Sequence, residues 1–195
     1  CVYNGPEGLR RAAETAHLAA ATVARALEAM DYRLASKEFF DTLEVEAEAA
    51  VVQSLALEQG INFYYPSEGR VRMSFDEVTT AAEIETVVSI FAAAKGKKAK
   101  AVKAVTESCV PTALRRQSPY LQEPVFNAYR SESALMRYIK KLELRDISLA
   151  NSMISLGSCT MKLNAAALMQ PLSLAGFQNM HPFAPADQAK GYMDL

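Results

Sequence analysis

The feature that most constrains this chain is a run of apolar residues at helical spacing near its start. Across residues 7–30 the apolar positions recur every three or four residues, while Arg10 and Arg11 fall on the opposite face. Such spacing is typical of an amphipathic α-helix. Pro6 is placed to begin that helix, because its fixed φ angle suits the first helical turn. We therefore expect one long helix that reaches about Met30.

Short strand and helix patterns follow this helix. The expected strands are residues 38–45, 61–65 and 71–75, and the expected helices between and after them are residues 46–59 and 84–91. Gly60 can end the first of these helices, Gly69 suits a hairpin turn at residues 66–70, and Thr80 with Glu83 forms a capping box. The order predicts a small α+β layer over residues 1–94, in which helices cover a short antiparallel sheet.

Residues 95–130 have the composition of a connection between domains. The lysine-rich run at 95–100 contains no aromatic residues, which favours a solvated linker over a site for phosphate or an acidic partner. Three prolines, Pro111, Pro119 and Pro124, predict irregular structure beyond it. We expect a domain boundary here.

Residues 131–195 are expected to be mainly helical. Ser131 can cap a helix whose apolar positions include Leu135 and Ile139, and Asp146 can cap a second helix. A short third helix is expected at residues 165–169, where Pro171 ends it.

The overall composition excludes several classes of protein. Half of the 195 residues are hydrophobic and the net charge is -1, so there is no bulk electrostatic case for a nucleic-acid or membrane partner. The sequence contains no run of about 18 apolar residues, so no membrane span is expected. Three widely spaced cysteines and two distant histidines give neither a disulfide framework nor a zinc site. The first residue is Cys1, and both ends are expected to be cut from a longer protein.

Reactive and hydrogen-bonding groups concentrate in residues 156–164, the stretch LGSCTMKLN. Ser158, Cys159 and Thr160 offer hydroxyls, a thiol and backbone N–H groups, Lys162 adds a cation, and Asn164 can cap the next helix. Such a set can hold a carboxylate or a phosphate. The alternative, favoured by composition alone, is a polar turn whose serine and threonine satisfy their own backbone.

Two histidines and one thiol are the other candidates for reactive side chains. A Cys159–His181 nucleophilic pair is geometrically possible, but a small lining thiol is favoured for Cys159. His181 lies in an aromatic, proline-bracketed loop that either lines a ligand pocket or packs as a loop. His17 is expected to be a satisfied or exposed helix histidine rather than a catalytic one. No sequence motif of a nucleotide-binding protein or a hydrolase is present.

These residues carry a family resemblance. Residues 156–164 form its most specific part, and the other matching runs are residues 3–10, 39–43, 124–127, 130–138, 142–146, 152–154, 181–183 and 188–192. Together they closely resemble the glycine dehydrogenase (decarboxylating) family, the P-proteins of the glycine cleavage system. Ser155, Leu168 and Arg130 depart from the residues that this family usually has.

The resemblance implies a fold, a chemistry and a set of partners. It implies an α/β chain of the aminotransferase-like fold type I, in an enzyme built from two such halves. Residues 1–94 would form the small α+β domain that ends the first half, and residues 95–130 would form a linker. Residues 131–195 would form the helical start of the second half. It also implies pyridoxal 5′-phosphate, decarboxylation of glycine and transfer of the aminomethyl group to the lipoyl arm of the H-protein, by a homodimeric enzyme of the bacterial cytoplasm or the mitochondrial matrix.

The same resemblance places the catalytic residues outside this chain. The Schiff-base lysine is expected downstream of Leu195, so no residue here is expected to be catalytic and the fragment alone is expected to be inactive. Ser158, Cys159, Thr160, Lys162, Asn164 and His181 are implied to line the cleft for substrate and cofactor. Two alternatives remain: a non-catalytic helical interaction module or degenerate homologue, and a thiol enzyme that uses Cys159 with His181.

Overall fold

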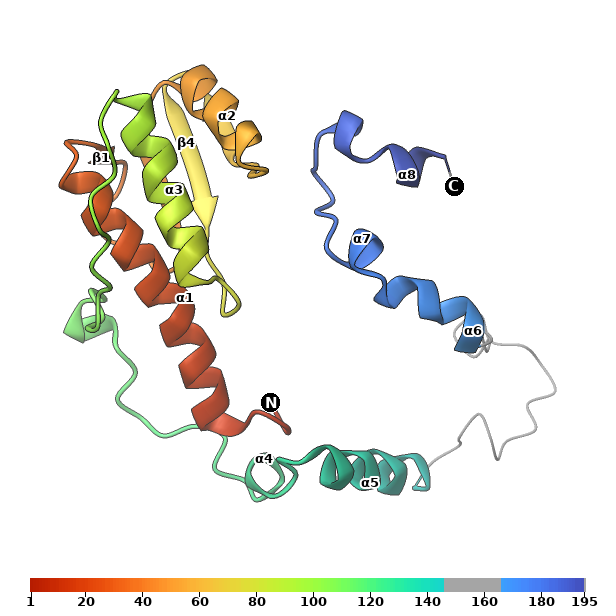
Figure 1. Cartoon of the computed structure of the whole chain (residues 1–195). Coiled ribbons are helices and arrows are strands. Elements are labelled where there is room, and N and C mark those ends of the chain that lie inside the picture. Colours follow the sequence, from red (N-terminus) through yellow and green to blue (C-terminus); the bar gives the residue numbers. More distant parts are fainter. Residues whose placement is uncertain (146–165, 195) are drawn as a thin grey trace. The chain divides into compact units, whose positions relative to one another are not determined.

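The computed structural model describes residues 1–145 and 166–194 (Figure 1). The chain divides into two compact units, Cys1–Glu132 and Ser133–Leu195. The first unit contains the sheet and the long helices, whereas the described part of the second contains helices and loops. This mixture of helices with a small antiparallel sheet is compatible with the α/β class predicted from the sequence.

The long helix α1 (Gly5–Glu28) confirms the expected N-terminal helix. It begins at Gly5, whose φ of +62° is accessible to glycine but strained for other residues, and Pro6 follows in the first turn. One face buries a stripe of small and branched side chains that includes Ala20, Val23 and Leu27. Exposure of that apolar stripe to water would cost free energy, so its burial holds α1 against the rest of the first unit.

Four strands form one antiparallel sheet in the order β1-β2-β4-β3. Their bounds are β1 (Arg33–Leu34), β2 (Thr42–Glu46), β3 (Tyr64–Ser67) and β4 (Arg70–Ser74). In the central pair Leu43 lies opposite Met73 and Val45 opposite Val71, and all four side chains are buried. The residues between them point to the other, polar face, as the two-residue period of a strand requires.

The sheet corrects three sequence predictions. The two-residue strand β1 was not expected, because so short a run has no periodicity of its own. The strand expected at residues 38–45 begins only at Thr42, since Phe39 packs on the core and the Phe40 carbonyl bonds to α1 instead of to a strand. The strand expected at residues 61–65 lies at Tyr64–Ser67, which leaves a turn of only two residues before β4.

Helices α2 (Ala49–Glu58) and α3 (Ala81–Ala94) complete the first unit, and Figure 1 shows α1 and α3 side by side. Val52 of α2 and Phe91 of α3 join the core that α1 shares with the inner face of the sheet. The capping box is confirmed, because Thr80 and Glu83 each accept a backbone N–H from the other. Gly60 ends α2 with a φ of +69°, as expected.

Residues 95–130 pack more closely on α1 than a solvated linker would. Val105 is buried and its N–H donates to the Thr22 hydroxyl of α1 at 3.0 Å, and the Tyr120 hydroxyl donates to the Pro6 carbonyl at 2.6 Å. The segment contains only two short helical turns, η1 (Thr112–Leu114) and α4 (Val125–Ala128). The prediction of irregular structure is confirmed, and the lysine-rich run at 95–100 is exposed as expected, whereas the segment beyond it contacts α1.

The second unit is described as short helices joined by loops. Its elements are α5 (Glu132–Glu143), which begins at the unit boundary, then α6 (Ala166–Met169), η3 (Gln170–Ser173), α7 (Ala175–Gln178), η4 (Ala186–Gln188) and α8 (Lys190–Met193). The helices expected after Ser131 and at residues 165–169 are confirmed. The helix expected from Asp146 lies outside the described residues.

Candidate functional site

The predicted site block falls outside what the structure describes. Ser158, Cys159, Thr160, Lys162 and Asn164 all lie between residues 146 and 165. Their roles in binding substrate or cofactor therefore stay predictions from the sequence. The Cys159–His181 pair likewise stays a prediction, because Cys159 lies outside the described residues.

His181 is the one predicted site residue whose surroundings are described. Its side chain is exposed, and its Nδ1 accepts the backbone N–H of Phe183 at 3.1 Å. The two rings lie 5.8 Å apart at 49°. In this arrangement Nδ1 is the hydrogen-bond acceptor, and Nε2 is the second ring nitrogen that can bond to a ligand or to solvent.

A second aromatic contact joins the segments that precede and follow His181. Phe177 and Tyr192 meet edge to face with centroids 5.5 Å apart, and the Tyr192 hydroxyl donates to the Phe177 carbonyl at 2.7 Å. This arrangement links α7 to α8 and makes residues 178–191 a closed loop. The loop is thus held at both ends, while the exposed ring of His181 remains available at its surface.

His17, by contrast, is buried in the first unit and fully engaged. Its side chain is 2% exposed and stacks on the ring of Phe40 at 5.3 Å. The Phe40 carbonyl lies 2.8 Å from Nδ1, and since a carbonyl only accepts, Nδ1 carries the proton. Nε2 accepts the backbone N–H of Cys109 at 3.1 Å. The expectation of a satisfied helix histidine is confirmed.

The Cys109 thiol beside His17 is not arranged as an activated nucleophile. Its Sγ lies 3.5 Å from Nε2, but the lone pair of that nitrogen already accepts the backbone N–H of the same residue. Arg115 fixes this turn by donating to the carbonyls of Ser108 and Val110 at 2.7 and 2.8 Å. The three segments around His17 therefore form a structural junction, which sequence spacing gave no means to detect.

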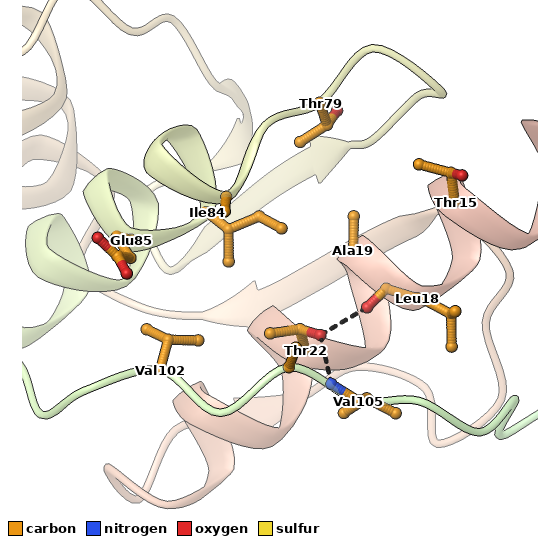
Figure 2. A pocket seen from close by; sticks show the side chains of 11 residues that line it. Thr15, Leu18, Ala19, Thr22, Thr79, Ile84, Glu85, Val102 and Val105 are labelled. Carbon is orange, nitrogen blue, oxygen red and sulfur yellow. Dashed lines mark hydrogen bonds between the residues drawn. The ribbon is translucent and has the colours of Figure 1, made fainter.

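A small groove lies between α1 and the start of α3 (Figure 2). Its volume is about 210 Å³, and its walls are mostly apolar side chains, with threonine hydroxyls and one carboxylate at their edges. The lining residues are Thr15, Leu18, Ala19, Thr22, Thr79, Ala81, Ile84, Glu85, Val102, Ala104 and Val105. Figure 2 shows the Thr22 hydroxyl donating to the Leu18 carbonyl and accepting the Val105 N–H, so this polar group is already satisfied.

The outer face of the sheet carries one cluster of charged residues. The Glu44 carboxylate accepts hydrogen bonds from the guanidinium groups of Arg70 and Arg72, with 2.9 Å between Arg72 Nε and the carboxylate. These bonds hold the pKa of the Glu44 carboxyl below its usual range, and the bond from Arg70 has a larger effect than the bond from Arg72. Arg72 also lies 5.5 Å from the centre of the Tyr64 ring. The cluster ties β2, β3 and β4 together.

The described lysines do not fit a site for an aldehyde cofactor. A Schiff-base lysine is normally activated in an apolar pocket or beside another cation, yet every described lysine side chain is exposed. Lys95 is the most constrained, and its ammonium donates to the carbonyls of Met30 and Asp31 at 2.8 and 2.7 Å.

Within residues 1–145 and 166–194, no three His, Cys, Asp or Glu side chains gather as a metal site. No described helix is long and apolar enough to cross a membrane.

Comparisons with known proteins place the whole chain beside one group of enzymes. Residues 1–91 match the sequence model of the glycine cleavage system P-protein. Over its full length the chain is 47% identical to a protein of Flavobacterium johnsoniae, 44% to one of Christiangramia forsetii and, with small gaps, 45% to one of Thermosynechococcus vestitus. Each of these is named glycine dehydrogenase (decarboxylating), and the chain spans about a fifth of its length.

Proposed function

We propose that this chain belongs to the glycine cleavage system P-protein family and supplies one segment of a glycine dehydrogenase that decarboxylates glycine. The observation that carries the proposal is the 47% identity that extends over all 195 residues. Similarity at this level covers both the folded first unit and the predicted site block. The segment forms about a fifth of such an enzyme, so the activity belongs to the longer polypeptide.

The cofactor of the whole enzyme is proposed to be pyridoxal 5′-phosphate. When bound, that cofactor supplies an electron sink for the electron pair that the departing carboxylate leaves behind. The exposed lysines of the described residues do not fit its attachment point. The attachment lysine is assigned to the part of the enzyme that this chain does not cover.

This chain's contribution is then structural and positional. Ser158, Cys159 and Thr160, with Lys162 and Asn164, are proposed to line the cleft where glycine and the cofactor meet. The sequence supports this role, because the block combines anion-binding N–H groups, hydroxyls and one cation in nine residues. His181 is proposed to lie at the same cleft, and the exposure of its ring supports this.

The fold is proposed to be that of fold type I enzymes with two aminotransferase-like halves. Residues 1–94 would form the small domain of the first half, and residues 131–195 the start of the second. The sheet of four antiparallel strands packed against three helices supports this assignment of the first region. A homodimer of the complete enzyme, a lipoylated H-protein as acceptor, and a location in bacterial cytoplasm or mitochondrial matrix belong to the same proposal.

A chimeric enzyme tests the proposal. The matched region of the Flavobacterium johnsoniae protein is replaced by this chain, and glycine-dependent CO₂ release is measured with lipoylated H-protein. We expect activity within about tenfold of the parent, which corresponds to about 1.4 kcal/mol of transition-state stabilisation. A chimera that folds and binds the cofactor but releases no CO₂ above background would contradict the proposal.

Two substitutions in the same chimera test the site block. Cys159→Ala and Lys162→Ala remove the thiol and the cation, and Thr15→Ala on α1 serves as a matched control because that side chain is exposed and remote in sequence. Loss of activity in the Lys162 variant, with the control unchanged, supports a role in the cleft. If both block variants keep CO₂ release and aminomethyl transfer at the level of the control, the block is a structural turn.

The second candidate function is a non-catalytic interaction module. The exposure of every described lysine and of the apolar side chains of the second unit favours it. The chimera separates the two, because a module that only binds a partner restores no CO₂ release when it stands in the enzyme.

A further inference from the structure

The second unit has no interior of its own among its described residues. In residues 133–145 and 167–194 no side chain is buried, although the first unit buries large ones such as Phe91 and Leu27 completely. Large apolar side chains of the second unit are instead open to solvent, with Leu168 72%, Met193 80% and Phe183 90% exposed. Soluble monomers rarely leave so many large apolar groups uncovered in one region.

Helix α5 shows the same property in an ordered pattern. Leu135, Ile139 and Leu142 recur at four and three residues, which places them in one stripe along the helix. Ile139 is 50% and Leu142 43% exposed, while Arg137 and Lys140 lie on the other side of the helix. A helix of 12 residues is marginal alone in water and is normally stabilised by packing of its apolar face.

The relatives indicate what covers these side chains. This chain accounts for 20% of the Flavobacterium johnsoniae protein, so four-fifths of that polypeptide is available as a covering surface. We propose that the apolar stripe of α5 and the exposed side chains of residues 168–193 form a docking surface for an apolar face of the glycine dehydrogenase polypeptide outside the matched region. This inference rests on the proposed function.

Hydrogen exchange in two settings tests the docking surface. The amides of α5 are followed in the isolated chain and in the chimera described above, where the rest of the enzyme is present. We expect protection of α5 to rise by at least about 100-fold in the chimera, because burial of its face suppresses local opening. Protection that is the same in both settings would show that the rest of the enzyme does not cover α5 and would overturn the proposal.

A matched pair of substitutions makes the test specific for the stripe. Ile139→Asp places a charge in the stripe, whereas Arg137→Asp introduces the same side chain on the other side of the helix. In the chimera the first is expected to lower α5 protection by at least about tenfold and the second by less than about threefold, because only the first buries an unpaired charge. Equal effects of the two substitutions would overturn the assignment of the docking face.

The remaining outcomes are also decisive. Protection of the isolated chain that rises with its concentration would assign the surface to a second copy, against the proposal. An inactive chimera whose α5 is protected would contradict the proposed function alone, whereas an active chimera whose α5 stays unprotected would overturn the docking surface alone.

Discussion

Replacement of His17 by phenylalanine removes the polar junction of the first unit but keeps its shape. The aromatic ring can still stack on Phe40, so the packing at 5.3 Å is largely preserved. Two groups lose their partners, namely the Phe40 carbonyl and the Cys109 N–H. Each lost bond costs about 1–2 kcal/mol where the group is left without a partner, so the free energy of unfolding is expected to fall by about 2–4 kcal/mol.

The expected change in melting temperature follows from the size of the unit. For a unit of this length, 1 kcal/mol corresponds to roughly 3 °C, so His17→Phe should lower Tm by about 6–12 °C. Thermal unfolding followed by circular dichroism measures this change, and Thr15→Ala on the same helix should change Tm by less than about 2 °C. The turn around Cys109 should also become open to proteases. A fall in Tm no larger than that of the control would refute the reasoning.

Three further predictions concern the first unit. Leu27→Ala removes a completely buried side chain from the core and should cost about 2–5 kcal/mol in a denaturant titration, with an unchanged m-value; a cost below about 1 kcal/mol would contradict the described core. Gly60→Ala places a side chain at a φ of +69° and should cost about 1 kcal/mol, read from the same titration, although open space surrounds the site; an unchanged midpoint would mean that the strain is relieved elsewhere. The lowered pKa of the Glu44 carboxyl means that its stabilisation is present above the ordinary value of 4.5 and is lost as pH falls through the folded value. Glu44→Gln should therefore lower Tm at about pH 7 and have almost no effect at about pH 2, and an equal loss at both would assign the effect to packing.

The sequence predicted those elements whose signals are local. The helix that became α1 has a long apolar period, the start of α3 is set by the Thr80–Glu83 capping box, and Gly60 adopts the positive φ that ends α2. Each of these signals acts within a few residues of the backbone that it shapes. They therefore hold regardless of what the rest of the chain does.

The errors arose where distant contacts decide the structure. The aromatic pair Phe39–Phe40 has the composition of a strand, but packing on the core and the bond to His17 take it out of the sheet. Strand β1 exists only because β2 lies beside it. The contact of the segment beyond the lysine-rich run with α1, through the buried Val105 and its bond to Thr22, was likewise not predicted. None of these contacts leaves a periodic pattern.

For the candidate site, too, the sequence predicted some features and not others. The motif LGSCTMKLN identified the family through its residue types alone, and the full-length identities to glycine dehydrogenases confirm that resemblance. The side chains of that motif lie outside the described residues. The bond from the Phe183 N–H to Nδ1 of His181 was not predicted, because it depends on the backbone conformation of the loop and not on residue types.

We propose that this chain is a working segment of a glycine decarboxylase. Its most direct test is the rate of glycine-dependent CO₂ release by the Flavobacterium johnsoniae enzyme in which this chain replaces the matched fifth, measured with lipoylated H-protein. The rate is expected to lie within about tenfold of that of the parent enzyme. A folded chimera that releases CO₂ no faster than the same mixture without glycine would contradict it.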